Sequence, residues 1–248
     1  MGLGKNWRWA LGLSLMVGSV LSLGPAFAQP HLEDDPPLAR AQARVVSHTV
    51  ASFDAKVTLR VYNYARIDSE SLARSEKVAD AIFGNVGIQT LWVDCPTSKE
   101  KLRAYPACLS EMGTTDLVVK ILPRPMAMKL RRHTESLGFA QACPETEPAC
   151  ELSVFYYRID ELATKGYKED RILGYVIAHE VAHVLIGPGH SEDGIMRGEW
   201  TPPDLQRISW GLPLNFTSDQ SKRLRDTVLR RTTRPVRESP MRAILTAR

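Results

Sequence analysis

The chain has 248 residues, a formal net charge of +4 at pH 7, and 44% hydrophobic residues. This length and apolar content suffice for one domain with a sizeable core, or for one domain built as two lobes. The charge is small for the size, so we expect no nucleic-acid partner and no dedicated membrane-binding surface.

The first 28 residues have the pattern of a secretory signal peptide. A basic start at Lys5 and Arg8 precedes an apolar stretch over 9–23 and the small-x-small motif at 26–28. The apolar stretch is shorter than the ~20 residues that a membrane span needs. We therefore expect cleavage rather than an uncleaved anchor, a secreted or periplasmic protein, and no membrane span in the mature form. The proline-rich, charged stretch 29–50 is predicted to be a flexible lead or short pro-segment.

Several segments have the composition and periodicity of β-strands. Strands are predicted at 56–65, 88–95, 116–122 and 151–159, and 136–142 could form a short edge strand. The run 116–122 is mostly apolar, so we expect it to be largely buried on both faces.

Three segments are predicted to be helices. Between 68 and 84, apolar residues recur at helical spacing until glycines end the pattern. Over 169–186, apolar residues cover almost the whole circumference, which is typical of an interior helix. A last helix over 217–231 begins with the capping-box pair Thr217 and Gln220. The order of strands and helices predicts an α/β (α+β) fold, a mixed sheet with helices packed on it.

All four cysteines, Cys95, Cys108, Cys143 and Cys150, follow the predicted signal peptide. An even number of cysteines in an oxidising compartment favours two disulfides over free buried thiols. Three pairings are possible. Cys95–Cys108 with Cys143–Cys150 is favoured because each of these pairs closes a short loop that contains proline.

Residues 179–196, HEVAHVLIGPGHSEDGIM, contain three of the six histidines. His179 and His183 are four residues apart on the predicted interior helix, so their imidazoles point the same way, with Glu180 beside the first. This arrangement matches the H-E-x-x-H motif, in which two histidines bind zinc and the glutamate is a general base. A catalytic zinc ion keeps one of four positions for water, so a third protein ligand is needed.

His190 is the favoured third ligand because 187–189, Gly-Pro-Gly, ends the helix and turns the chain. If His190 does not reach the metal, Glu192, Asp193 and Glu199 are the alternatives, as in zinc enzymes with two histidines and a carboxylate. Chance occurrence of the motif is the competing interpretation. An unpaired glutamate in an interior helix would be costly to desolvate, which favours a metal site.

The stretch 179–196 resembles the zinc-binding signature and methionine turn of the metzincin metallopeptidases, H-E-x-x-H-x-x-G-x-x-H followed by a methionine turn. Its GHS ending is similar to the matrixin-like branch. One departure is that three residues separate His183 from Gly187, where the family pattern has two. No tyrosine directly follows Met196, so the tyrosine ligand of some family branches has no counterpart there.

The resemblance implies that His179, His183 and His190 bind Zn²⁺, that Glu180 is the catalytic base, and that Met196 packs beneath the histidines. It also implies a metzincin-like mixed sheet with an active-site helix, a second packing helix, and a small C-terminal lobe closed by a helix. The catalytic domain would span 51–248, with an upper lobe to about 187, a lower lobe over 188–232 and a basic tail over 233–248.

The expected activity is that of an exported, monomeric zinc metalloendopeptidase acting on a peptide or protein. A zinc-activated water attacks the peptide carbonyl, and Glu180 transfers its proton to the leaving amine. The edge strand near 137–140 could pair with an extended substrate. Two other functions stay open: a non-catalytic exported zinc-binding module on the same fold, and a zinc hydrolase of non-peptide amides.

Overall fold

The computed structural model describes residues 54–130 and 136–233. The signal peptide predicted at 1–28, the lead predicted at 29–50, and nearly all of the basic tail predicted at 233–248 lie outside these residues. None of the described helices combines the length and the apolar character that crossing a membrane requires.

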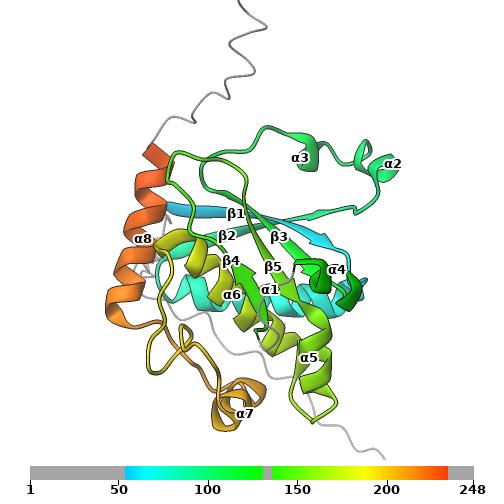
Figure 1. Cartoon of the computed structure of the whole chain (residues 1–248). Helices are drawn as coiled ribbons and strands as arrows, with labels where there is room; N and C mark the ends of the chain where they lie inside the picture. The colour runs from blue at the N-terminus through cyan, green and yellow to red at the C-terminus, as the bar shows by residue number, and fades with distance from the viewer. Residues whose placement is uncertain (1–53, 131–135, 234–248) are drawn as a thin grey trace, which may run out of the picture. The chain divides into compact units, whose positions relative to one another are not determined.

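The described residues form a five-stranded mixed sheet in the order β2-β1-β3-β5-β4 (Figure 1). The strands are β1 (Ala55–Asn63), β2 (Ile88–Cys95), β3 (Asp116–Leu122), β4 (Gly138–Ala140) and β5 (Cys150–Phe155). The pairs β1–β2, β1–β3 and β3–β5 are parallel, and the short edge strand β4 runs antiparallel to β5. The predicted mixed sheet and its edge strand are confirmed.

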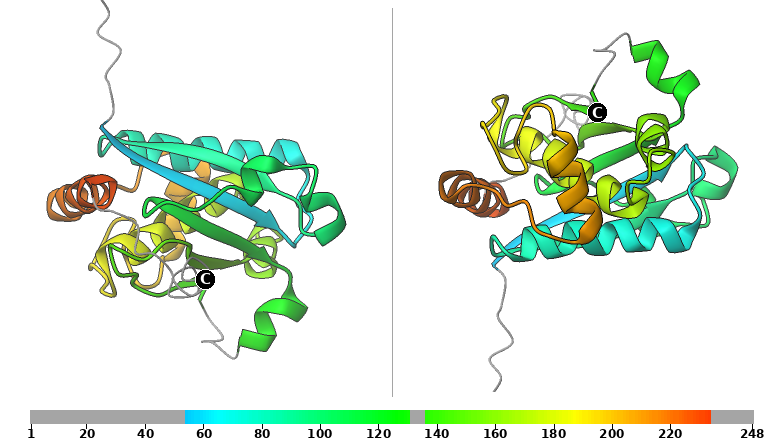
Figure 2. Two further views of the ribbon diagram at one scale, coloured as in Figure 1. Left: turned by 90° about the horizontal axis from the view of Figure 1, so that it is seen from above. Right: turned by 90° about the horizontal axis from the view of Figure 1, so that it is seen from below.

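Two long helices, α1 (Ser69–Gly84) and α6 (Glu169–Ile186), cover the same side of the sheet (Figures 1 and 2). Strand β3 directs Leu117, Val119 and Ile121 into the core at 0% exposure. Its alternate residues Val118 and Lys120 are only half-buried. The prediction that 116–122 would be buried on both faces was therefore wrong, because these helices cover only one face.

Helix α6 has the predicted bounds, and twelve of its 18 residues are buried, as expected for an interior helix. Helix α8 (Ser218–Thr233) begins directly after Thr217, the first residue of the predicted capping pair. Gln220 N–H donates to Thr217 Oγ1 at 3.2 Å, and Thr217 N–H donates to Gln220 Oε1 at 2.9 Å. Helix α8 packs against both α6 and the sheet strand β1.

Two helices of eight and nine residues were not predicted from the sequence. The strand predicted over 151–159 ends at Phe155, and helix α5 (Tyr156–Ala163) begins directly after it. The β-favouring residues there adopt a helix because this buries Ile159 completely, and packing overrides a weak local propensity. Helix α7 (Pro202–Trp210) is the second, although Thr201 and Asp204 form a capping box with two prolines between them.

Shorter helical turns occupy the connections. They are α2 (Lys99–Leu102), α3 (Pro106–Leu109), α4 (Arg124–Ala127) and the 3₁₀ helix η1 (Met128–Leu130). The structure joins Cys95 to Cys108 and Cys143 to Cys150, which is the favoured pairing. The first disulfide ties the end of β2 to α3, and the second ties the segment after β4 to the start of β5.

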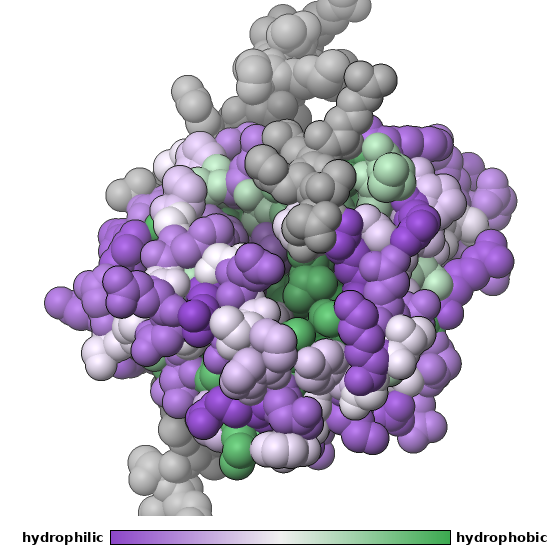
Figure 3. Space-filling model, turned by 60° about the horizontal axis from the view of Figure 1, so that its bottom comes forward, coloured by the Kyte–Doolittle hydropathy of each residue, from purple (hydrophilic) through white to green (hydrophobic). Residues whose placement is uncertain are grey.

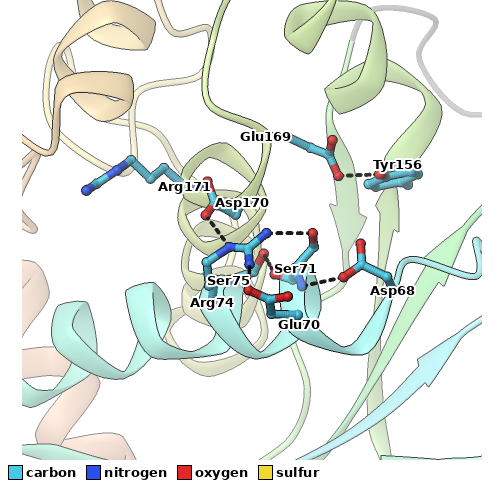
Figure 4. A network of polar contacts seen from close by, with 9 residues as sticks. All are labelled: Asp68, Glu70, Ser71, Arg74, Ser75, Tyr156, Glu169, Asp170 and Arg171. Atoms are coloured by element: carbon cyan, nitrogen blue, oxygen red, sulfur yellow. Dashed lines mark hydrogen bonds and ion pairs between the residues drawn. The ribbon is translucent and has the colours of Figure 1, made fainter. Parts of the chain in front are cut away.

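The start of α6 is held by polar contacts with α1 and α5 (Figure 4). Arg74 Nε donates to Asp170 at 3.0 Å, and the Tyr156 hydroxyl donates to Glu169. One turn further along, Gly174 lets the two helices approach closely, because a Cβ there would lie 2.6 Å from the Ser75 carbonyl oxygen. These contacts fix the helix that carries His179, Glu180 and His183.

Candidate metal centre and active-site cleft

Three imidazole rings converge at one point beside α6. His183 Nε2 lies 3.0 Å from His179 Nε2 and 3.2 Å from His190 Nε2. Three nitrogens bound to one tetrahedral zinc ion at 2.0–2.1 Å would be about 3.3 Å apart. The spacing therefore fits a zinc ion held by all three rings, and these residues are a group that could hold a metal.

The opposite ring nitrogens contact backbone carbonyls. His179 Nδ1 lies 2.8 Å from the Ile195 oxygen, and His183 Nδ1 lies 3.2 Å from the Gly187 oxygen. With the proton on Nδ1, each ring donates to its carbonyl and leaves the Nε2 lone pair free for a metal. Burial, above all, lowers the pKa of His179 to about 4, which keeps that ring neutral. Burial lowers the pKa of His183 as well.

His190 reaches the other two rings although it comes one residue later than in the family pattern. Gly187 and Gly189 take φ values of 88° and 135°, which side chains rarely tolerate. Ser191 N–H then donates to the Met196 carbonyl at 2.8 Å and closes the loop. The His190 ring lies on Gly198, where a Cβ would be 3.0 Å from Nδ1. The additional residue is absorbed by this glycine-rich path.

The alternative ligands are not part of the cluster. Of the described histidines, cysteines and acids, the metal-binding group contains the three histidines and none of Glu192, Asp193 and Glu199. Glu199 instead lines the cleft in front of the site.

The methionine turn lies directly behind the histidines. Gly194, with φ 75°, leaves no room for a side chain beside the Asn215 carbonyl, to which Ile195 N–H donates at 3.2 Å. The Ile195 carbonyl in turn accepts a hydrogen bond from His179 Nδ1. Met196 follows with 1% exposure, and its role as an apolar floor stays a prediction.

Trp200 is a site residue that the sequence patterns did not indicate. Its Nε1–H donates at 3.2 Å to the Ile195 carbonyl that His179 also contacts. Its ring meets the His179 ring edge-on, with centroids 5.9 Å apart, and packs similarly on Tyr175. Trp200 therefore braces His179 in two ways. It lies in a proline- and tryptophan-rich stretch without periodicity, so only its proximity to the methionine turn could have drawn attention to it.

Glu180 is 5% exposed and lines the cleft beside the histidines. Burial raises the pKa of its carboxyl group to about 8. A group with this pKa exchanges protons near neutral pH, which suits a general base or acid.

A cavity of about 1030 Å³ opens in front of the histidines. It is lined by the segments 136–142, 188–190 and 197–200, and by apolar side chains of α5, α6 and α7 that include Leu162, Val176 and Leu205. The face of the molecule drawn in Figure 3 is hollowed at its centre, where hydrophobic residues gather. The cavity therefore combines a floor of three converging histidines, a sheet edge along one lip and an apolar recess.

No family model and no curated protein matches the chain. Solved structures that are similar to it include the following three. The first, archaemetzincin from Methanopyrus kandleri, is 19% identical, with a TM-score of 0.40 over 75% of this chain and 99% of that chain. Metalloproteinase-II from Bacteroides fragilis is 10% identical, with a TM-score of 0.46 over 73% of this chain and 55% of that chain. Myroilysin is 12% identical, with a TM-score of 0.29 over 67% of this chain and 71% of that chain.

Proposed function

We propose that the protein is an exported zinc-dependent endopeptidase. The observation that carries this proposal is the convergence of the His179, His183 and His190 Nε2 atoms beside Glu180 on the floor of an open cleft. The three rings would hold a zinc ion, which would supply Lewis acidity toward a water molecule and the substrate carbonyl. Glu180 would accept a proton from the attacking water on its carboxylate and donate it to the leaving amine.

The cleft is suited to an extended peptide. Strand β4 pairs with β5 on one side only and is the last strand of the sheet among the described residues. Because residues 136–142 line the cleft, the other edge of β4 can hydrogen-bond a substrate backbone by strand addition. A substrate held this way passes the metal centre with chain on both sides, which favours cleavage within a peptide.

Export is part of the same proposal. It is supported by the signal-like pattern over 1–28 and by two disulfides, which persist in oxidising compartments. N-terminal sequencing of the protein recovered from outside the cytoplasm would test it. Cleavage after Ala28 is expected.

Substitution of the proposed base tests the chemistry. Glu180→Gln is expected to lower kcat for peptide hydrolysis by about 10²–10⁴-fold, the usual contribution of a general base, with zinc still bound stoichiometrically. Glu192→Gln, which changes an exposed acid on the histidine loop, is the matched control. Retained activity in the Glu180 variant would eliminate the mechanism.

The same assay distinguishes the two alternative functions, a non-catalytic zinc-binding module and a zinc hydrolase of non-peptide amides. Stoichiometric zinc without cleavage of any peptide by the wild-type protein, including after removal of 29–50, would identify a binding module. Hydrolysis of non-peptide amides without cleavage of peptides would identify a zinc hydrolase of non-peptide amides. The carboxyl group of Glu180 in an open cleft favours catalysis, since structural zinc sites are typically closed by four protein ligands.

A further inference from the structure

Gly138 is a buried residue that lies against the side chain of Glu180. It is the first residue of β4 and pairs with Val154 of β5. The neighbouring Leu137 carbonyl accepts from Phe155 N–H at 2.8 Å. The sheet therefore fixes the backbone at Gly138, and both Gly138 and Glu180 line the cleft.

The space that a side chain at 138 would need is filled by Glu180. A Cβ at Gly138 would lie 2.6 Å from Glu180 Oε1, 2.7 Å from Cγ and 2.8 Å from Cδ, and real Cβ atoms essentially never approach other atoms this closely. An exposed glutamate could swing away at little cost. Glu180 is only 5% exposed and projects from the interior helix α6. Its side chain therefore has few alternative conformations.

Packing, rather than hydrogen bonding, sets the position of the Glu180 carboxylate. Across residues 54–130 and 136–233, Glu180 makes neither a side-chain hydrogen bond nor an ion pair. Gly138 supplies one wall of the space in which that carboxylate lies. We propose that Gly138 is a positioning residue, whose lack of a side chain leaves the catalytic carboxylate room beside the metal centre. The catalytic part of this inference rests on the proposed function.

Kinetics of Gly138→Ala provide the first test. The added methyl group is expected to displace the carboxylate and lower kcat by about 10²-fold, since a shift of about 1 Å at a reacting group can cost that much. KM and zinc content should stay unchanged, because the histidines keep their contacts. Gly84→Ala is the control, since a Cβ at Gly84 meets nothing within 4 Å. Wild-type kcat in Gly138→Ala would overturn the proposal, as would a change confined to KM.

A second test requires no activity. Glu180→Ala removes Cγ, Cδ and Oε1, the three atoms that a Cβ at 138 would overlap. Gly138→Ala should lower the thermal midpoint of the full-length wild-type protein by about 5 °C, as overpacking does, and should lower that of Glu180→Ala much less. Equal losses in the two backgrounds would show that the two residues are not coupled and would refute the inference.

The two tests separate this inference from the proposed function. If the wild-type protein binds zinc but cleaves no peptide, the proposed function fails, while the thermal comparison still decides whether Gly138 and Glu180 compete for the same space.

Discussion

His190 joins the other two histidines because three glycines near it lack side chains. Gly187 and Gly189 adopt backbone angles that other residues avoid, and Gly198 lets the His190 ring approach its backbone closely. Trp200 and Gly138 act on the same centre from outside the signature, one through the Ile195 carbonyl and one through the space it leaves for Glu180. Single residues inside and outside the signature thus determine the geometry of the site.

Glu76 is a partly buried acid that makes stability depend on pH. Burial raises the pKa of its carboxyl group to about 8, and the charges of Asp94 and Asp80 add to this effect. Its Oε1 atom is buried without a hydrogen-bond partner. The folded protein therefore holds a proton on Glu76 that the unfolded chain releases above its ordinary pKa of 4.5. Between pH 4.5 and pH 8 this group lowers the stability of the fold as the pH rises.

We expect Glu76→Gln to remove this dependence. At pH 8 the variant should be more stable than the wild type by on the order of 1 kcal/mol, a value reduced for partial exposure. Below pH 4.5, where both states are protonated, the two proteins should differ little. Urea unfolding at several pH values measures this, with the exposed acid Glu100, changed to Gln, as the control. An unchanged pH profile in Glu76→Gln would contradict the assignment.

At the scale of elements, the site depends on how α6 is seated on α1 and the sheet. The polar contacts of Arg74 and Tyr156 hold its first turn, and the close approach at Gly174 sets its separation from α1. Two histidines and the proposed base all project from this helix. A displacement of α6 would therefore move three functional groups together while His190 stays on its own loop.

Gly174→Ala tests this arrangement. A Cβ would lie 2.6 Å from the Ser75 carbonyl and 2.7 Å from Val78 Cβ, so the helices must separate. We expect a loss of about 1–3 kcal/mol in unfolding free energy, typical of overpacking, together with weaker zinc binding. Chemical denaturation and zinc competition with a chelator measure the two effects. Gly113→Ala, where a Cβ makes only an ordinary contact with Asp116, should change neither. Wild-type stability in the Gly174 variant would mean that the helices are not in tight contact.

At the scale of the whole described molecule, long-range contacts join segments that no local pattern connects. Arg231 of α8 is fully buried and donates to the Thr114 carbonyl at 3.0 Å and to the Cys143 carbonyl at 2.7 Å. Cys143 N–H also donates to the Val184 carbonyl in the last turn of α6 at 3.2 Å. The disulfide segment after β4, the last turn of α6 and the last helix are thus linked beside the cleft.

Zinc should add a further link between α6 and the loop that follows it. A metal that binds only the folded chain, at a free concentration of 100 times Kd, stabilises it by about 2.7 kcal/mol. Removing zinc should therefore lower the thermal midpoint by about 5–10 °C. Calorimetry of the zinc-loaded and chelated protein measures the shift. His190→Ala should show a smaller shift in the thermal midpoint when zinc is removed. Identical midpoints for the zinc-loaded and chelated wild-type protein would contradict a specific zinc site.

The sequence by itself determined the features that depend on neighbours within a few turns of chain. Periodicity predicted the order of the main strands and the bounds of α6, and the spacing of cysteines and histidines indicated the disulfides and the candidate ligands. Tertiary structure decided the rest: that β3 has one half-buried face, that Tyr156 begins a helix, that His190 reaches the cluster, and that Gly138 and Trp200 border the site. These outcomes depend on tertiary packing and on the path of the loop after α6, and local propensities of a fraction of a kcal/mol do not determine them.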